Sequence, residues 1–238
     1  MEFGLNNRFR FYINTTPLST ATLSRIAKGI TSFVPSYNDV LDQSAYIDGN
    51  GFGSTDKTGA QWIGTASGHR VYGDASQDFV AGLKLKMGDD CKTNFVGYDQ
   101  LGNKLEVSSV TVCNIVDGGG EAQGKTEFTY ELHGNGKPTL TPGSAAAALT
   151  ATVAVGVAVG TTSFSATPGS GNHLGYRLTA AALTPNGYSW SGDDVITYTS
   201  GDDIAATAGQ YINMYEIDAD GSVIKFLSHL LEAGDIKA

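Results

Sequence analysis

Histidine and cysteine are the residue types best able to hold a metal ion or attack a substrate, and this chain has few of them. They are His69, His133, His173, His229, Cys91 and Cys113. No two of the histidines stand four residues apart, and no cysteine lies near a histidine in the sequence, so the usual spacing of metal motifs is missing. This spacing favours surface or turn histidines. We expect neither a metal site nor a cofactor.

Three pairs of adjacent aspartates could in principle supply the carboxylates of a glycosidase or a metal site. They are Asp89 with Asp90, Asp193 with Asp194, and Asp202 with Asp203. Each pair follows or flanks a glycine, which favours solvated acids in turns. The chain also lacks the G-x-S-x-G pattern of a nucleophile elbow. We therefore expect a protein that is not an enzyme, with a hydrolase that uses these aspartates as a minor alternative.

The composition favours an all-β chain. Its 238 residues include 31 glycines, and only 16% are charged. Average proteins of this length have about 17 glycines and about 25% charged residues. Many short strands joined by glycine turns explain this bias. The net charge of −9 repels nucleic acid at long range and disfavours specific DNA binding.

The two cysteines and the start of the chain bear on where the protein works. Two cysteines without a C-x-x-C pair do not make a disulfide framework, so a reduced, intracellular protein fits best. Met1–Gly4 lacks the basic and apolar regions of a signal peptide. The most apolar run, Ala145–Val159, is too short and too weakly hydrophobic to span a bilayer.

A change in charge near Pro138 and Pro142 indicates two domains. Before it the chain has 12 Lys+Arg and 15 Asp+Glu, and after it 3 Lys+Arg and 9 Asp+Glu, which together give the net −9. The segment 135–144 is rich in Gly, Pro and Asn, as linkers and turns are. We place the domains at residues 1–140 and 141–238.

The first domain is expected to be mainly β with a single helix. The expected strands are Arg8–Ile13, Leu23–Val34, Ile63–Val71, Thr93–Asp99, Leu105–Val116 and Thr126–Leu132. The segment Asp48–Gly59 is polar and glycine-rich, which predicts a long loop. The helix is expected over Asp74–Met87, with Asp74 as its N-cap and Gln77 as the capping-box partner.

The second domain is expected to be a small Ig-like β-sandwich of six short strands. They are Leu149–Val159, Thr162–Thr167, Leu174–Leu183, Val195–Thr199, Tyr211–Ile217 and Val223–Leu227. Pro-Gly, Pro-Asn-Gly and Ala-Asp-Gly turns separate several of them.

Several segments of the first domain follow one another in a familiar order. They are S-F-V-P-S-Y-N-D (32–39), Y-I-D-G-N-G (46–51), T-A-S-G-H-R-V-Y-G-D (65–74), S-Q-D-F-V (76–80) and F-T-Y-E-L-H-G-N-G-K-P-T (128–139). Over about residues 1–140 the chain resembles the major tail proteins, or tail tube proteins, of long-tailed, non-contractile bacteriophages. The S-G-x-R-x-x-G-D step into the helix is the most specific of these motifs.

The resemblance implies a fold, an assembly and a set of partners. The fold is a β-sandwich or partly open barrel with one flanking helix. The assembly is a stack of hexameric rings that forms the tail tube of the virion, through which DNA passes without specific binding. By the same resemblance the partners are copies of the chain, a tape measure protein, and tail completion and baseplate proteins. No membrane is involved, and the protein is made in the cytoplasm of the host bacterium. The second domain resembles the outer β-sandwich that decorates some tubes.

The resemblance also points to two candidate interfaces. The long loop and its flanks match the loop that family members send to the adjoining ring: Tyr46, Ile47, Asp48, Phe52, Trp62 and Ile63. The alternative is a surface loop whose flanking aromatics lie in the subunit's own core. The alternating segment Phe9, Phe11 and Ile13 suits an N-terminal arm that docks on a neighbour, or else an internal edge strand.

A DNA-conducting tube is expected to have an acidic and polar lumen, because Lys and Arg contacts to phosphate would hold the DNA. The strand-associated candidates for this surface are Asp99, Glu106, Glu127 and Glu131.

A second class of function remains open from the sequence. The C-terminal sandwich could be a carbohydrate-binding or adhesive module that uses Tyr188, Trp190 and Tyr198 as a stacking platform.

Overall fold

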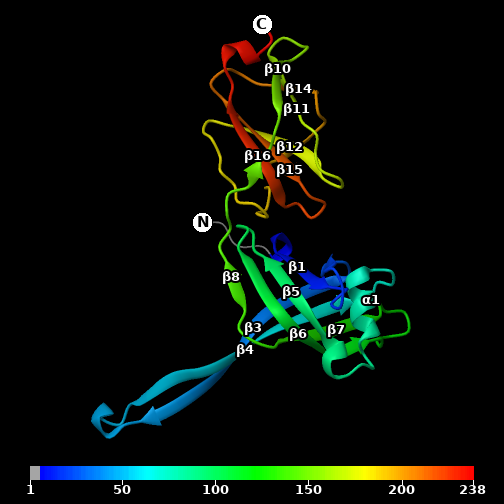
Figure 1. Ribbon diagram of the computed structural model, residues 1–238, viewed down its shortest axis with the longest axis vertical. Coiled ribbons are helices and arrows are strands. Elements are labelled where there is room, and N and C mark those ends of the chain that lie inside the picture. The colour runs from blue at the N-terminus through cyan, green and yellow to red at the C-terminus, as the bar shows by residue number, and fades with distance from the viewer. Residues whose placement is uncertain (1–5) are drawn as a thin grey trace. The chain divides into compact units, whose positions relative to one another are not determined.

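The computed structural model describes residues 6–238, and their regular structure is almost entirely β. The described chain forms two compact units (Figure 1). The N-terminal unit comprises residues 10–97 and 105–140, and the C-terminal unit comprises residues 6–9, 98–104 and 141–238. The proposed domain boundary at 140/141 is one of the points where the chain passes between them. Among the described residues, we find no helix with the length and apolar character needed to cross a bilayer.

The N-terminal unit is built on one open sheet of eight strands. The strands are β1 (Arg10–Asn14), β2 (Leu23–Arg25), β3 (Ile30–Ala45), β4 (Gly53–His69), β5 (Lys92–Tyr98), β6 (Lys104–Asp117), β7 (Glu127–Gly134) and β8 (Thr139–Thr141). Their order is β2-β1-β5-β6-β7-β4-β3, with β8 also paired to β6. The sheet has two free ends, β2 and β3, so it is not a closed barrel.

The core of this unit is a cluster of aromatic rings from strands that lie far apart in the sheet order. The ring centroid of Phe33 on β3 is 4.3 Å from that of Phe11 on β1 and 5.4 Å from that of Phe95 on β5. Trp62 on β4 approaches Phe95 at 4.7 Å. Strands near opposite ends of a flat sheet could not meet in this way, so the sheet curls and packs the aromatic side chains on its inner face.

The expected helix is present but shorter, as α1 (Ala75–Gly82). Asp74 is its N-cap, as predicted, because its Oδ1 accepts the backbone N–H of Gln77 at 3.0 Å. The Gln77 side chain does not complete a capping box. It is 1% exposed, and it donates to the carbonyl oxygen of Lys28 and accepts the backbone N–H of Val71. This amide therefore ties the helix to two neighbouring segments.

The single strand expected over Leu23–Val34 is two strands, β2 and β3, with Gly29 between them. Gly29 has φ +75°, a left-handed conformation that glycine adopts without strain. A Cβ placed on Gly68, opposite this turn, would lie 2.2 Å from the Gly29 carbonyl oxygen. The two glycines allow a close approach of backbones that larger residues would prevent.

The C-terminal unit is a sandwich of a three-stranded and a five-stranded sheet, in the orders β10-β11-β14 and β13-β12-β15-β16-β9. The strands are β9 (Ala147–Ala148), β10 (Thr152–Val155), β11 (Thr161–Ser165), β12 (His173–Thr179), β13 (Ile196–Tyr198), β14 (Asp203–Ala205), β15 (Tyr211–Ile217) and β16 (Val223–Leu230). Its core includes Phe164, Ile212 and Met214, all fully buried. Within residues 6–238, four short 3-10 helices complete the two units: Asn6–Arg8, Ile47–Gly49, Gly88–Cys91 and Ala233–Asp235.

The strand expected over Leu149–Val159 is reduced to β10, because the chain turns after Val155. The turn is held by Asp203, whose carboxylate accepts the backbone N–H groups of Val157 and Ala158 at 2.7 and 2.8 Å. These bonds lower the pKa of Asp203. Three of the short strands, β8, β9 and β14, lie outside the expected strands, since two or three residues leave too little periodicity to recognise.

Candidate assembly interface

The most prominent feature of the N-terminal unit is a long hairpin formed by β3 and β4. The two strands pair from Ile30 opposite Gly68 to Ala45 opposite Gly53. The next strand, β7, pairs with β4 only from Ile63 onward, so the outer part of the hairpin is a two-stranded ribbon that leaves the sheet (Figure 1). Most of the segment Asp48–Gly59, expected to be a loop, is therefore strand.

This ribbon is long and has little support of its own. Residues 37–45 span about 30 Å at roughly 3.3 Å per residue. An isolated two-stranded hairpin is at best marginally stable in water. A ribbon of this length is a structure that gains stability when it lies against another surface.

The tip of the hairpin exposes three large apolar side chains. Ile47 is 102% exposed, Phe52 is 81% exposed and Tyr46 is 59% exposed. Asp48 lies between them in the 3-10 turn. The chain reverses through Asn50 and Gly51, which have φ of 50° and 85°. Apolar groups displayed together at the end of a projecting element indicate an interaction site.

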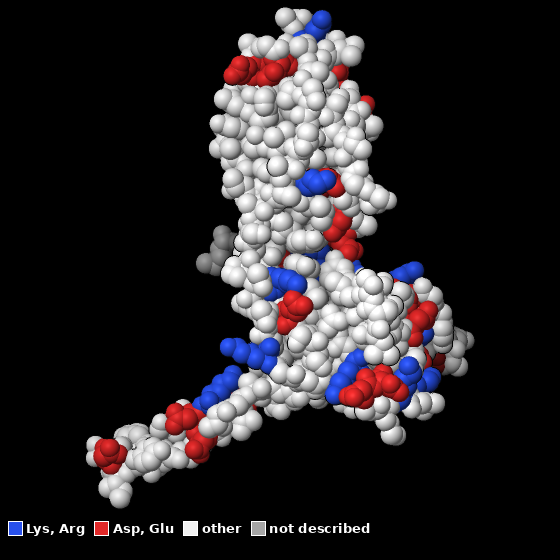
Figure 2. Space-filling view, in the orientation of Figure 1, with Lys and Arg blue, Asp and Glu red and all other residues white. Residues whose placement is uncertain are grey.

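The shaft of the hairpin is also apolar on its surface, with Tyr37, Val40 and Leu41 each more than half exposed. Its charges are mainly acidic: Asp39, Asp42, Asp48 and Asp56 against Lys57. Figure 2 shows acidic patches separated by uncharged surface along the ribbon, and basic groups near its base. The outer side of β3 has no neighbouring strand among residues 6–238, which leaves a sheet edge open to pairing.

Two of the residues expected at the interface, Trp62 and Ile63, do not lie at the tip of the hairpin. Trp62 is 1% exposed and packs against Phe95, so its side chain belongs to the core of its own unit. Ile63, the next residue on β4, faces the opposite side and is partly buried. The expectation that Trp62 contacts a neighbouring ring is therefore wrong, because strand alternation turns it inward. Tyr46, Ile47, Asp48 and Phe52 remain at the tip.

A groove lies on the same unit beside the base of the hairpin. Its volume is about 590 Å³. It is lined by Tyr37, Lys57, Trp62, Leu105, Lys137 and Leu140, among others. The lining is mostly apolar, with two lysines, so its character complements that of the acidic, apolar hairpin tip.

The N-terminal segment is not a free arm. Phe11 and Ile13 lie on β1, between β2 and β5, and are 9% and 0% exposed. Their side chains already pack in the core of their own unit. Moving each of them into water would cost about 1.5–3 kcal/mol of free energy. Phe9 directly precedes this strand. The expected N-terminal arm is therefore wrong, and the alternative, a strand within the subunit's own sheet, is what the structure shows.

The four acidic residues expected in the lumen do not share one surface. Asp99 belongs to the C-terminal unit, where its carboxylate accepts the N–H groups of Leu101 and Asn103 and shapes a turn. Glu106 is partly buried on β6. Glu127 and Glu131 share the face of β7 opposite its buried side chains.

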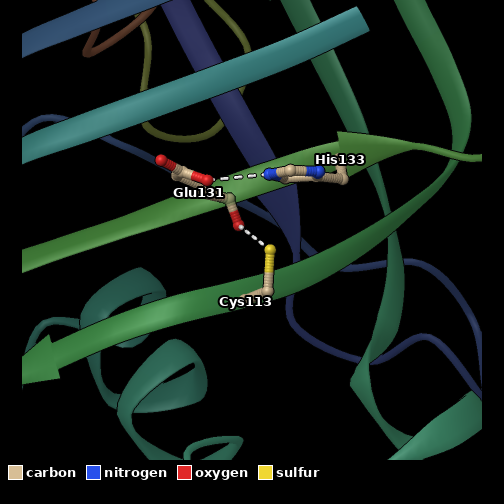
Figure 3. Close-up of side chains that lie close together, drawn as sticks. All are labelled: Cys113, Glu131 and His133. Carbon is tan, nitrogen blue, oxygen red and sulfur yellow. Dashed lines mark hydrogen bonds and ion pairs between the residues drawn. The ribbon is translucent and has the colours of Figure 1, made fainter. Parts of the chain in front are cut away.

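That face of β7 also presents a cluster that sequence spacing did not predict (Figure 3). The metal-ligating atoms of Cys113, Glu131 and His133 all lie within 4.8 Å of one another. The His133 Nε2 and Glu131 Oε2 atoms are 2.8 Å apart, and the Asn114 amide donates to the same oxygen at 2.7 Å. These two bonds hold the pKa of Glu131 below its ordinary value. The cluster depends on the pairing of β6 with β7, which no local motif encodes.

The groups expected for the alternative functions do not converge. Tyr198 is 7% exposed, and its hydroxyl lies 2.9 Å from the backbone carbonyl oxygens of Phe164 and Asp202, so it cannot stack on a sugar beside Tyr188 and Trp190. Among the aspartates, Asp89 pairs with Lys92, Asp193 with Arg8 and Asp194 with Arg177, while Asp203 caps a turn. These carboxylates serve in separate local contacts.

Comparisons with known proteins give matches to two kinds of assembly. Residues 154–234 match the family model of the S-layer protein SbsC C-terminal domain. A solved structure of SbsC domains 7, 8 and 9 is 23% identical and covers 58% of this chain and 38% of that one, with a TM-score of 0.39. A chain from the tail of an empty GTA particle, refined with C6 symmetry, is 10% identical and covers 58% and 99%, with a TM-score of 0.48.

Another structure, of SbsC domains 4–9, is 15% identical and covers 99% of this chain and 52% of that one, with a TM-score of 0.37. The chain thus spans 38% and 52% of the two S-layer chains. A comparison with curated proteins gave no significant match.

Proposed function

We propose that this chain is a structural, non-enzymatic subunit that assembles with copies of itself into stacked hexameric rings. The rings form the tail tube of a phage or phage-like particle, with an acidic and polar lumen that conducts DNA. The hairpin of β3 and β4 is the observation that carries the proposal. It places exposed apolar side chains at the end of a long ribbon, where a second copy can bury them.

In this assembly the hairpin tip of one copy contacts the unit of another. The groove beside the hairpin base is the acceptor we assign to it, because its apolar lining suits Ile47 and Phe52 and its Lys137 suits Asp48. The donor and acceptor surfaces differ, so the contact is head-to-tail, and such contacts close into rings or continue as tubes. Burying Ile47 and Phe52 contributes about 1.5–3 kcal/mol each.

The remaining parts of the proposal follow from the sequence resemblance. The partners are a tape measure protein and tail completion and baseplate proteins, and DNA passes transiently. The protein is made in the host cytoplasm and ends in the virion tail. The C-terminal unit is an outer decoration domain. GTA tails, refined with C6 symmetry, are an assembly of the proposed kind, although the hairpin is what supports the proposal for this chain.

The second candidate is an adhesive or carbohydrate-binding module. The observation behind it is the match of residues 154–234 to a family named for a surface-layer protein, SbsC. It concerns the C-terminal unit, so it is also compatible with a decoration domain on a tube.

Electron microscopy of the concentrated, purified protein tests the proposal. We expect rings or hollow tubes from the wild type, and no tubes from the variant Ile47→Asp/Phe52→Asp, because two charges would have to be buried at the contact between rings. The variant Leu18→Asp/Leu85→Asp is the matched control, since the two leucines are 96% and 88% exposed elsewhere on the same unit.

Dispersed monomers of the wild type, together with binding on a glycan array, would favour the adhesive module. Tubes formed equally well by the tip variant would refute the role of the hairpin.

A further inference from the structure

The cluster of Cys113, Glu131 and His133 lies where the ladder between β6 and β7 is interrupted. Cys113 pairs with Glu131, and the next paired residues are Val116 and Thr129. Two residues of β6, Asn114 and Ile115, therefore stand opposite one residue of β7, which is a β-bulge. Asn114 adopts φ 52° there. Bulges re-aim side chains, and this one directs the Asn114 amide to the Glu131 carboxylate.

We propose that Cys113, Glu131 and His133 bind one Zn²⁺ ion. Thiolate, imidazole and carboxylate are the three side-chain ligands that zinc takes in proteins, whereas calcium and magnesium take oxygen ligands. Two of the three come from alternate positions on one strand and the third from the cross-strand partner, so regular β geometry brings them to one face.

The distances allow closure around a metal ion with side-chain motion alone. Zinc bonds of about 2.0–2.3 Å place tetrahedral ligand atoms roughly 3.3–3.7 Å apart. The ligand atoms here lie within 4.8 Å of one another. The Glu131–His133 contact of 2.8 Å must widen slightly, and the Cys113 thiol, now 3.8 Å from the Glu131 carbonyl oxygen, must turn toward the two side chains.

The charge balance and the surroundings also suit the ion. One thiolate, one carboxylate and one neutral imidazole offset the two positive charges of zinc. The site with bound zinc is therefore neutral, and its partial burial has a small desolvation penalty. The His133 and Glu131 side chains are 29% and 33% exposed, which leaves an entry path and a fourth position for water. The Asn114 amide orients the carboxylate from outside the site, as supporting groups in metal sites do.

Without a metal ion the thiol is kept protonated. Burial raises the pKa of Cys113, and the negative Glu131 and the nearby Cys91 raise it further. A bound cation reverses the effect of the carboxylate, so binding releases the thiol proton. The ion would then join β6 to β7 at the position where the bulge removes backbone pairing.

Cobalt titration of the untagged, reduced protein tests the site. Co²⁺ bound by a thiolate gives a charge-transfer absorption band in the near ultraviolet, which Zn²⁺ should abolish by displacement. We expect this band in the wild type and its loss in Cys113→Ser and in His133→Gln. Asn114→Ala should weaken binding about tenfold, because it removes the group that orients Glu131.

Two controls separate this cluster from incidental binding. Cys91→Ala removes the other cysteine, and His173→Gln removes an exposed histidine far from the cluster in sequence. Both should retain the band, and circular dichroism shows which variants are folded. Zinc should also raise the melting temperature of the wild type and of His173→Gln, but not of Cys113→Ser. No band in the wild type, or a band that survives in Cys113→Ser, would overturn the proposal.

Discussion

At the scale of single residues, Glu216 is a buried carboxylate in the sandwich of the C-terminal unit. Its side chain is 1% exposed. It accepts hydrogen bonds from the Lys225 ammonium, the Asn172 amide and the Gly169 N–H at 2.7, 2.6 and 2.9 Å. Burial by itself would raise the pKa of Glu216, but these three donors together lower it below 4.5. The carboxylate thus connects a turn to two strands.

This residue gives the sandwich a dependence on pH. Because the folded state lowers the pKa of Glu216, the stabilisation is complete above the unfolded value of about 4.5 and is lost as the pH falls through the lower folded value. Glu216→Gln should reduce the free energy of unfolding by about 1–3 kcal/mol at pH 7. The difference from the wild type should shrink as the pH falls below about 4. Urea unfolding at several pH values measures it, and a difference independent of pH would contradict this account.

At the scale of elements, the hairpin is separable from the fold that carries it. Strand pairing of residues 41–58 is confined to the hairpin itself, since β7 joins β4 only at Ile63. The inner part of the same two strands contributes Phe33 and Trp62 to the core. One element therefore has two roles: its base holds the sheet together, and its outer part is offered to another molecule.

A shortened hairpin should keep the fold and lose the stacking of rings. We would remove residues 41–58 and join Val40 to Gly59, its partner in the ladder, through an Asn-Gly turn. The melting temperature should change by no more than a few degrees, because the removed residues bury little against the rest of the unit. Rings should still form, but stacked tubes should be absent in electron micrographs. Tubes of normal length from a folded variant would show that the hairpin does not carry the contact.

At the scale of the whole molecule, we expect the N-terminal unit to carry the assembly contacts and the C-terminal unit to be an outer decoration domain. The division is not a simple cut in the sequence, because the turn at 98–104 belongs to the C-terminal unit. Within that unit the turn is held by bonds from Trp190 N–H to the Gln100 carbonyl and from the Asn186 amide to the Leu101 carbonyl, at 2.9 and 3.0 Å.

Deletion of residues 141–238 tests this division. The remaining chain should fold and still form tubes, with a lowered melting temperature because the turn at 98–104 loses its partners. Circular dichroism and electron microscopy measure the two properties. A truncated protein that folds but never polymerises would place part of the assembly contact in the C-terminal unit.

The sequence predicted those features that depend on residues close to one another in the chain. The N-cap at Asp74 was predictable, since capping involves residues three apart, and so was the strand Tyr211–Ile217, which is rich in apolar and aromatic residues and ends in a turn. The sequence predicts a loop over Asp48–Gly59, the outer part of the hairpin, because glycine and polar residues outnumber apolar ones there. Both faces of that ribbon are exposed, so the alternation that marks a half-buried strand is missing.

The sequence by itself determined the β class, the capped helix and the chemical character of the hairpin tip, because these follow from neighbouring residues. Only the tertiary structure decided that Phe11, Ile13 and Trp62 are core residues and that Cys113 meets Glu131 and His133. The physical reason is that strand alternation assigns side chains to two faces. Which face is buried, and which strands become neighbours, depends on how the whole sheet pairs and curls.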